Sequence, residues 1–118
     1  MEPDHEHDRW TATEEERGYI RARLRLVTTE QGGRHTAIHS GYRAHWAFPS
    51  DVHRERHDAP LTLEGRKTLA PGNEAMIRLH PLAPDLWPPI SAGLRLSMLE
   101  GPRLVGLADV VNVVPPLS

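Results

Sequence analysis

Histidine is the first candidate for chemistry in this chain, because eight histidines and no cysteine occur in 118 residues. Without thiolates, histidine and carboxylate side chains are the strong ligands left for a transition metal. The candidate groups are His5 and His7 beside Asp8, and the pairs His35 with His39 and His53 with His57. Ligands four positions apart converge only on a helix, and we expect both pairs in loops. The histidines are therefore predicted to be solvated, with no metal site and no cofactor.

Catalysis by a nucleophile or by paired carboxylates has weak support. The sequence has no Gly-x-Ser-x-Gly elbow, and its serines fall in predicted turns or on an outer strand face: Ser40, Ser50, Ser91 and Ser97. Glu100 lies in a predicted hairpin turn, and Asp109 is expected to form a structural ion pair with an arginine. No Gly-x-x-x-x-Gly-Lys-Ser/Thr phosphate loop occurs. We expect a binding protein rather than an enzyme.

Charge divides the chain into two parts. The first sixteen residues carry seven acids and one base, a net −6, whereas the rest carries nine acids and thirteen bases, a net +4. Thirteen of the fourteen bases are arginine, which suits either carboxylate and phosphate recognition or a GC-rich genome. The acidic start is unlike a signal peptide, and no apolar run approaches a membrane span. We expect a cytoplasmic protein.

The segments that would position any site show a polar–apolar pattern that repeats every second residue. From Tyr19 to Leu26, polar and apolar side chains alternate, which is typical of a strand with one buried face. Similar patterns, separated by Gly- and Pro-containing turns, predict six strands near residues 19–26, 42–48, 61–63, 75–80, 94–99 and 104–114. No convincing helix is present. The pattern predicts an all-β fold, a closed barrel or a sandwich, because closure removes exposed edges.

The predicted organisation is a flexible, disordered acidic arm over 1–16, a barrel over 17–114 and a tail over 115–118. Trp10 in the arm is either a lone exposed aromatic or an anchor that docks it. Arg21, Arg23 and Arg25 form a basic ridge on the outer face of the first strand, which is either a docking surface for acid or phosphate or simply a solvated face. One hypothesis is that the arm folds back on this ridge and competes with a polyanionic partner.

Six short motifs, in order, cover about residues 18–114: Gly32-Gly33-Arg34-His35-Thr36, Gly41-Tyr42-Arg43, Ala70-Pro71-Gly72-Asn73, His80-Pro81-Leu82-Ala83, Gly93-Leu94-Arg95-Leu96 and Glu100-Gly101-Pro102-Arg103-Leu104-Val105-Gly106. Together they resemble the third domain of the bacterial elongation factor Tu. The resemblance implies a six-stranded antiparallel closed barrel. It also implies a translation protein, and we expect such a domain occurring alone, because no GTPase signature accompanies it.

In that family the barrel contacts the T-stem of aminoacyl-tRNA, the exchange factor Ts and the GTPase domain. The resemblance implies partner or tRNA contacts at Arg34, Glu100 and Gly101, which match the family, and at three positions where this chain has histidine: His45, His53 and His80. The placement of His53 involves a one-residue gap. Histidine is mostly neutral at pH 7, so we expect RNA binding to be weak.

From these residues we predict a non-catalytic binding module in translation. Its expected partner is a protein surface, such as a translation factor or a GTPase domain, and any binding to tRNA is expected to be weaker. The alternative is an interaction or decoy protein that mimics the factor's barrel, or replaces it within a split factor. A third possibility is an accessory domain without a role in translation. No membrane and no nucleotide are expected as partners.

Overall fold

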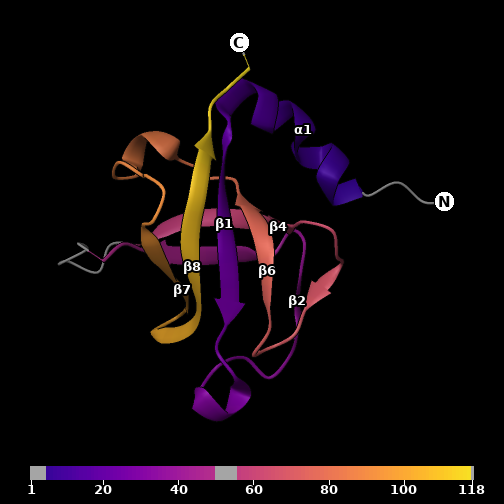
Figure 1. The fold of residues 1–118 in the computed structure, drawn as a ribbon, viewed down its shortest axis with the longest axis vertical. Helices are drawn as coiled ribbons and strands as arrows, with labels where there is room; N and C mark the ends of the chain where they lie inside the picture. The colour runs from indigo at the N-terminus through magenta and orange to yellow at the C-terminus, as the bar shows by residue number, and fades with distance from the viewer. Residues whose placement is uncertain (1–4, 50–55, 118) are drawn as a thin grey trace.

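The computed structural model describes residues 5–49 and 56–117, and the side chains from Trp10 onward within those ranges. Its regular elements are α1 (His5–Arg17), β1 (Tyr19–Leu26), η1 (Thr29–Gln31), β2 (Ile38–His39), β3 (Arg43–Ala47), β4 (His57–Leu63), β5 (Thr68–Leu69), β6 (Glu74–Leu79), η2 (Pro84–Leu86), β7 (Arg95–Glu100) and β8 (Arg103–Val114). Figure 1 shows the chain from α1 to the C-terminal tail.

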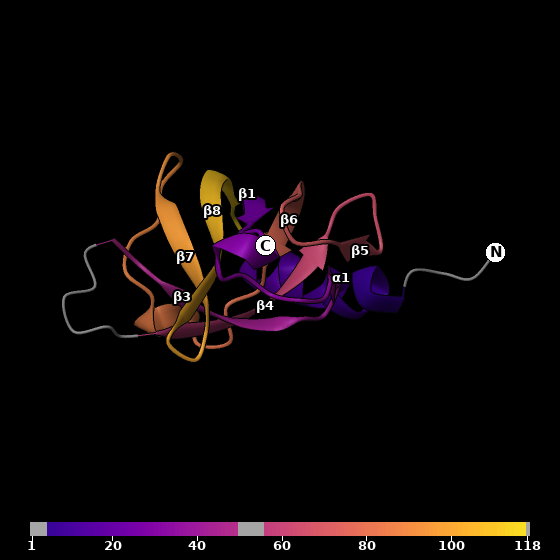
Figure 2. The same ribbon diagram turned by 90° about the horizontal axis from the view of Figure 1, so that it is seen from below.

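Six strands close into an antiparallel barrel in the order β1-β6-β4-β3-β7-β8. The predicted six-stranded closed barrel is therefore confirmed. In Figure 2 the β3–β4 pair faces β1, β6 and β8 across the interior. A separate two-stranded sheet, β2 with β5, was not predicted.

The barrel interior is filled by the apolar half of each alternating pattern. In β1, Ile20, Ala22, Leu24 and Leu26 are buried while the intervening residues face outward. Trp46 of β3 is completely buried, and its indole Nε1 donates a 3.0 Å hydrogen bond to the carbonyl of Ala59 on β4. The bond satisfies the one polar atom of a large core side chain, as burial of tryptophan requires.

The N-terminal arm is helical where the structure describes it. Residues 5–16, predicted to be disordered, belong to helix α1, which runs from His5 to Arg17. Gly18 ends the helix with φ +76° and donates its N–H to the carbonyl of Glu14 at 2.7 Å. A side chain at Gly18 would place Cβ 2.2 Å from the carbonyl oxygen of Val114, so glycine is required where the helix turns into β1.

Strand β4 begins earlier than the sequence pattern predicted. The segment 51–59 was predicted to be a charged loop, but the strand begins at His57, inside that segment. Asp58 pairs with His45 across the β3–β4 ladder, and Ala59 faces the interior.

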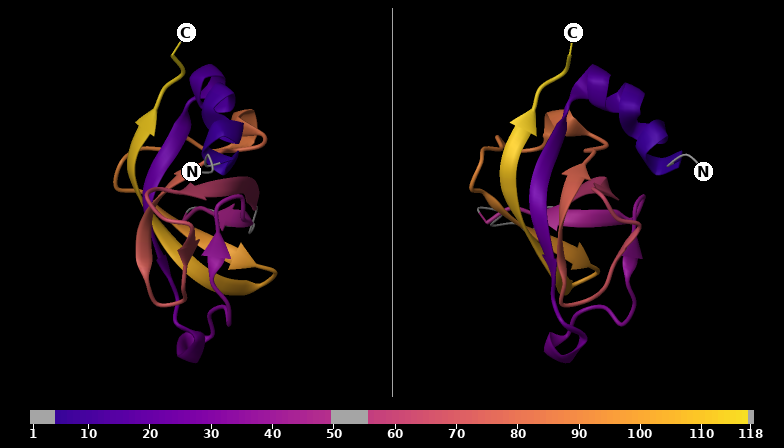
Figure 3. Two further views of the ribbon diagram at one scale, coloured as in Figure 1. Left: turned by 90° about the vertical axis from the view of Figure 1, so that its right-hand side faces the viewer. Right: turned by 45° about the vertical axis from the view of Figure 1, so that its right-hand side comes forward.

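The two ends of the barrel carry different features. α1, the C-terminal tail and η2 lie at one end, whereas η1 and the hairpin between β7 and β8 lie at the other (Figures 1 and 3). Within the described residues, no helix is long and apolar enough to cross a membrane.

Candidate partner-binding site

The loop that carries Arg34 is fixed by short-range hydrogen bonds. Thr28 caps η1 through its hydroxyl, which accepts from the N–H of Gln31 at 3.1 Å, and the Thr29 hydroxyl donates to the Arg34 carbonyl at 2.6 Å. A Cβ at Gly33 would lie 2.2 Å from the carbonyl oxygen of Val27. The loop therefore folds back tightly on the end of β1 and holds Arg34 in one place.

Arg34 meets Glu100 and Tyr42 at this end of the barrel. The Arg34 guanidinium and the Tyr42 hydroxyl both donate to Glu100 Oε2, and Arg34 Nη1 also lies 3.2 Å from the Tyr42 hydroxyl. The Arg34 guanidinium carbon is 4.9 Å from the centre of the Tyr42 ring. The Arg34 and Glu100 side chains are 19% and 28% exposed, so the cluster is half-buried and still reachable from solvent.

The surroundings tune the protonation of this cluster. Burial raises the pKa of Tyr42, and the charge of Arg34 opposes that rise only in part. Tyr42 is therefore a neutral hydroxyl at physiological pH, and it donates its proton to the carboxylate. Tyr42 was not among the predicted site residues, although it belongs to the Gly41-Tyr42-Arg43 motif.

A second polar group lies on β3, on β4 and at the hairpin between β7 and β8. The carbonyl of Gly101 accepts a hydrogen bond from Arg56, and His45 faces Leu99 across the β3–β7 ladder. His45 Nδ1 is 2.6 Å and Arg43 Nη2 is 3.0 Å from the Asp58 carboxylate. We call the whole set the Arg34–Glu100 surface: Arg34, Tyr42, Arg43, His45, Arg56, Asp58, Glu100 and Gly101.

Of the six predicted contacts, Arg34 and Glu100 bind each other, Gly101 follows Glu100 in the hairpin, and His45 lies opposite Leu99, the residue before Glu100. His53 lies outside the described residues. His80 lies elsewhere, against Trp10 of α1, and it is buried. His80 therefore does not contribute to the Arg34–Glu100 surface, and the prediction that it contacts a partner there is wrong.

His80 is covered by the helix that was expected to be disordered. The Trp10 indole stacks on the His80 ring with centroids 4.3 Å apart and planes 4° from parallel. His80 Nε2 shares a 3.0 Å hydrogen bond with the Thr62 hydroxyl. Burial, with a smaller effect from the nearby charge of Arg78, lowers the pKa of His80 to about 4. The ring is neutral at pH 7, and Trp10 acts as the anchor of the helix.

The basic ridge is largely neutralised by neighbouring acids. Arg21 binds Glu64 through two hydrogen bonds of 2.9 and 2.8 Å. Arg23 lies opposite Asp109, and Arg25 lies opposite Glu74. The ridge therefore offers little net charge to a polyanion.

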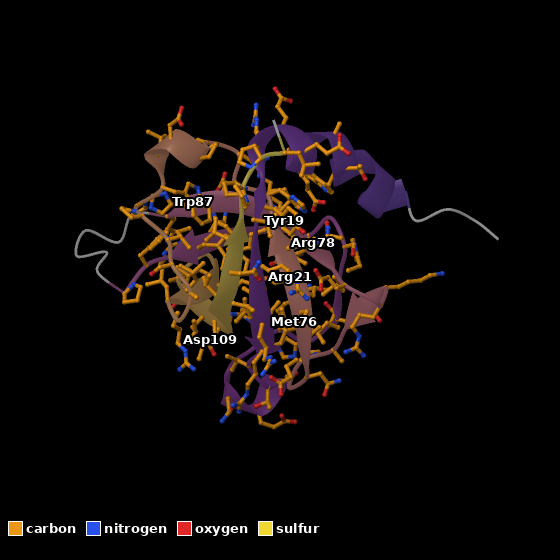
Figure 4. All side chains as sticks on the ribbon, turned by 45° about the horizontal axis from the view of Figure 1, so that its top comes forward. Tyr19, Arg21, Met76, Arg78, Trp87 and Asp109 are labelled. Atoms are coloured by element: carbon orange, nitrogen blue, oxygen red, sulfur yellow. The ribbon has the colours of Figure 1, made fainter. Side chains whose placement is uncertain are left out.

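The acidic helix docks beside the ridge rather than on it. Glu14 accepts a 2.9 Å hydrogen bond from Arg78 Nη1, and Arg78 Nε donates to Glu64 at 2.8 Å. Arg78 is the cross-strand neighbour of Arg21, and Figure 4 shows both side chains on the same face. The two arginines hold the pKa of Glu64 below its usual value, mainly through the hydrogen bond from Arg21.

The other predicted side chains have structural partners. Asp109 binds Arg95 through two hydrogen bonds of 2.8 and 3.2 Å, so the expected arginine pairing is confirmed. The Ser40 hydroxyl accepts a hydrogen bond from the Leu63 N–H at 2.9 Å. Among the side chains that the structure describes, no group of three or more His, Asp or Glu residues is placed to hold a metal ion. His5, His7 and Asp8 are outside those side chains.

A groove that the sequence did not predict lies beside α1. A groove of about 380 Å³ lies at the α1 end of the barrel, lined by Tyr19, Trp87, Ile90, Val113 and several prolines together with His80 and Arg17. The prolines at 81, 84, 88 and 89 were predicted to form only an irregular connection, and three of them, Pro81, Pro84 and Pro88, line this groove.

A comparison of the chain with models of known protein families finds no match.

Proposed function

We propose that this barrel is a non-catalytic binding module related to the third domain of elongation factor Tu, and that it docks through the Arg34–Glu100 surface on a protein of the translation apparatus. The partner would be a translation GTPase domain or its exchange factor. The observation that carries the proposal is the meeting of Arg34, Tyr42 and Glu100. Three of the motifs that carry the resemblance thus supply one half-buried, preorganised cluster.

The chemistry of the surface favours a protein partner over RNA. Arginine and tyrosine are enriched at the centres of protein interfaces. RNA affinity comes mostly from cations that neutralise phosphates, but Arg34 is paired with Glu100 and Arg43 with Asp58. His45 shares the Asp58 carboxylate as well. Few uncompensated positive charges therefore remain for a phosphate backbone.

The test is calorimetric titration of the chain with three candidates, each alone: the GTPase domain of elongation factor Tu, elongation factor Ts and aminoacyl-tRNA. We expect binding to one of the two proteins, and a loss of at least about tenfold in affinity for Arg34→Ala, the size of an interface hot spot. Arg66→Ala is the matched control, because Arg66 is exposed and makes only a 3.4 Å hydrogen bond to a backbone carbonyl.

Binding to neither protein would overturn the proposal. Tight binding to aminoacyl-tRNA that persists at high salt would also contradict it and would favour RNA recognition by shape and hydrogen bonding. Equal affinities of the Arg34→Ala and Arg66→Ala variants would place the interface elsewhere on the barrel.

A further inference from the structure

Within the described part of the chain, the end of β8 has a free edge. β7 pairs with β8 only as far as Arg95 opposite Asp109, and Val110 then exchanges hydrogen bonds with Gly93 and Leu94. β8 continues to Val114 with β1 as its neighbour. Among the described residues, no backbone hydrogen bond reaches the other edge of β8 beyond Val110. The amide and carbonyl groups that this segment turns away from β1 are thus open to another strand.

The inner face of the same segment is uncovered. Val113 lies directly opposite Ile20 in the β1–β8 ladder, so the two side chains point to the same side of the sheet. Ile20 is 5% exposed, whereas Val113 is 46% exposed. An inward-facing valine of a barrel strand normally contacts a core neighbour, and here the groove takes the place of that neighbour.

The groove beside this edge has a definite chemical character. Its walls include the aromatic rings of Tyr19 and Trp87 and the aliphatic side chain of Ile90, and Figure 4 shows Tyr19 and Trp87 at this end of the barrel. Among the residues that the structure describes, no carboxylate lines the groove, and the exposed Arg17 is its one permanently charged residue. An occupant with an apolar body and a negative charge at its end matches these walls.

One buried polar atom at the groove also lacks a partner. His80, whose side chain is 1% exposed, uses Nε2 for Thr62, and among the described residues its Nδ1 has no hydrogen-bond partner. The nearest carboxylate oxygen, Glu14 Oε2, is 3.8 Å away, too far for a hydrogen bond.

We infer that the groove between β8 and the 87–90 segment binds an extended, apolar peptide segment with an acidic residue at one end, which adds as a strand to the open edge of residues 111–114. Backbone hydrogen bonds to β8 would supply affinity, and alternate side chains entering the groove would supply selectivity. Arg17 would hold the acidic residue. None of the residues of the Arg34–Glu100 surface lines the groove, so the inference goes beyond the proposed function.

The test uses a panel of capped hexapeptides in which valine or isoleucine alternates with threonine and one aspartate stands at either end. Amide resonances of the intact chain are followed by NMR during titration. We expect shifts centred on residues 111–114 and on the Trp87 indole. Methylating alternate peptide nitrogens, which removes strand hydrogen bonds and keeps the side chains, should abolish binding, and replacing aspartate by lysine should weaken it.

Val113→Lys places a charge in the groove and should reduce peptide affinity at least about tenfold. Leu104→Lys is the matched control, because Leu104 lies on the same strand with 42% exposure, near its other end. Should Val113→Lys fail to fold, the methylated peptides decide the question on the unmodified chain. Arg34→Ala should leave peptide binding unchanged, so this inference and the proposed function fail independently.

Three results would overturn the inference: no binding by any peptide of the panel at millimolar concentration, equal binding of methylated and unmethylated peptides, or unchanged binding to Val113→Lys. A fourth would reassign the groove. Self-association of the chain that Val113→Lys abolishes and Leu104→Lys does not would identify a second copy, rather than a foreign peptide, as the occupant.

Discussion

Arg34 and Glu100 are 66 positions apart in the chain and share a hydrogen-bonded ion pair at the end of the barrel opposite α1. The pair joins the loop after β1 to the hairpin between β7 and β8. Because Tyr42 donates to the same carboxylate oxygen, Glu100 connects three segments with one side chain. Partner recognition and local stability at this end therefore depend on the same residue.

Replacing Glu100 by alanine should lower the free energy of unfolding by about 1–2 kcal/mol, because it leaves two half-buried donors without their acceptor. Urea denaturation followed by circular dichroism measures the change. Glu74→Ala is the control, since Glu74 is exposed, and it should change stability by less than about 0.5 kcal/mol. Equal effects of the two substitutions would show that the cluster adds no more to the free energy of unfolding than an exposed glutamate does.

Trp10→Ala should release α1 from the barrel while leaving the barrel folded, because the stack on His80 is the main aromatic contact of the helix. Hydrogen exchange should accelerate for the amides of α1 and remain slow in β1, β6 and β8. The pKa of His80 should rise toward 6.5 once the helix no longer buries it. Glu16→Ala, at an exposed position of the same helix, should change neither the hydrogen exchange of α1 nor the pKa of His80. Unaltered hydrogen exchange in the Trp10→Ala variant would mean that other contacts hold α1.

Stability should fall on acidification through His80. Its pKa is lowered to about 4 in the native state from 6.5, so above about pH 6.5 the ring is neutral in both states and contributes no pH dependence. Between about pH 6.5 and 4 the unfolded chain binds the proton first, and the native state loses about 2 kcal/mol by about pH 5. His80→Phe should remove this part of the pH dependence; identical pH profiles for the two proteins would contradict the assigned burial.

Glu64→Gln should weaken the contact between β1, β4 and β6, because Arg21 and Arg78 face each other across the ladder and share this carboxylate. The expected loss at pH 7 is about 1 kcal/mol, since the pairs are partly exposed. The native pKa of Glu64 is lowered, so its contribution is present above about pH 4.5 and disappears as the pH falls through the native value. Denaturation curves of the two proteins should therefore converge in acid, and a difference that persists there would point to packing instead of charge.

The barrel could be predicted because polar and apolar residues alternate along the sequence of its strands. In β1 every second residue from Ile20 to Leu26 is buried, as the period of two requires. The start of β4 could not be predicted in the same way, because His57 and Asp58 look like loop residues and are fixed in the strand by pairing with β3. Helix α1 has a polar sequence with a single large aromatic residue, and its docking depends on His80 and Arg78, which are remote in sequence.

The candidate site was predictable only in part. Arg34 and Glu100 were selected by resemblance, and spacing alone contains no sign that two residues in different loops meet. His80 was placed among the contacts because its position matches a surface residue of the family, but burial under Trp10 removes it. The groove lies where β8 extends beyond the end of its pairing with β7. This is a property of strand pairing, which the sequence of one segment does not reveal.

The most direct test of the central claim is the affinity of the intact chain for the elongation factor Tu GTPase domain and for elongation factor Ts, measured in parallel for the unmodified protein, Arg34→Ala and Arg66→Ala. The account predicts that one of the two proteins binds, that Arg34→Ala weakens this binding at least about tenfold, and that Arg66→Ala leaves it unchanged. Absence of binding to both proteins, or equal binding by all three forms of the chain, would contradict it.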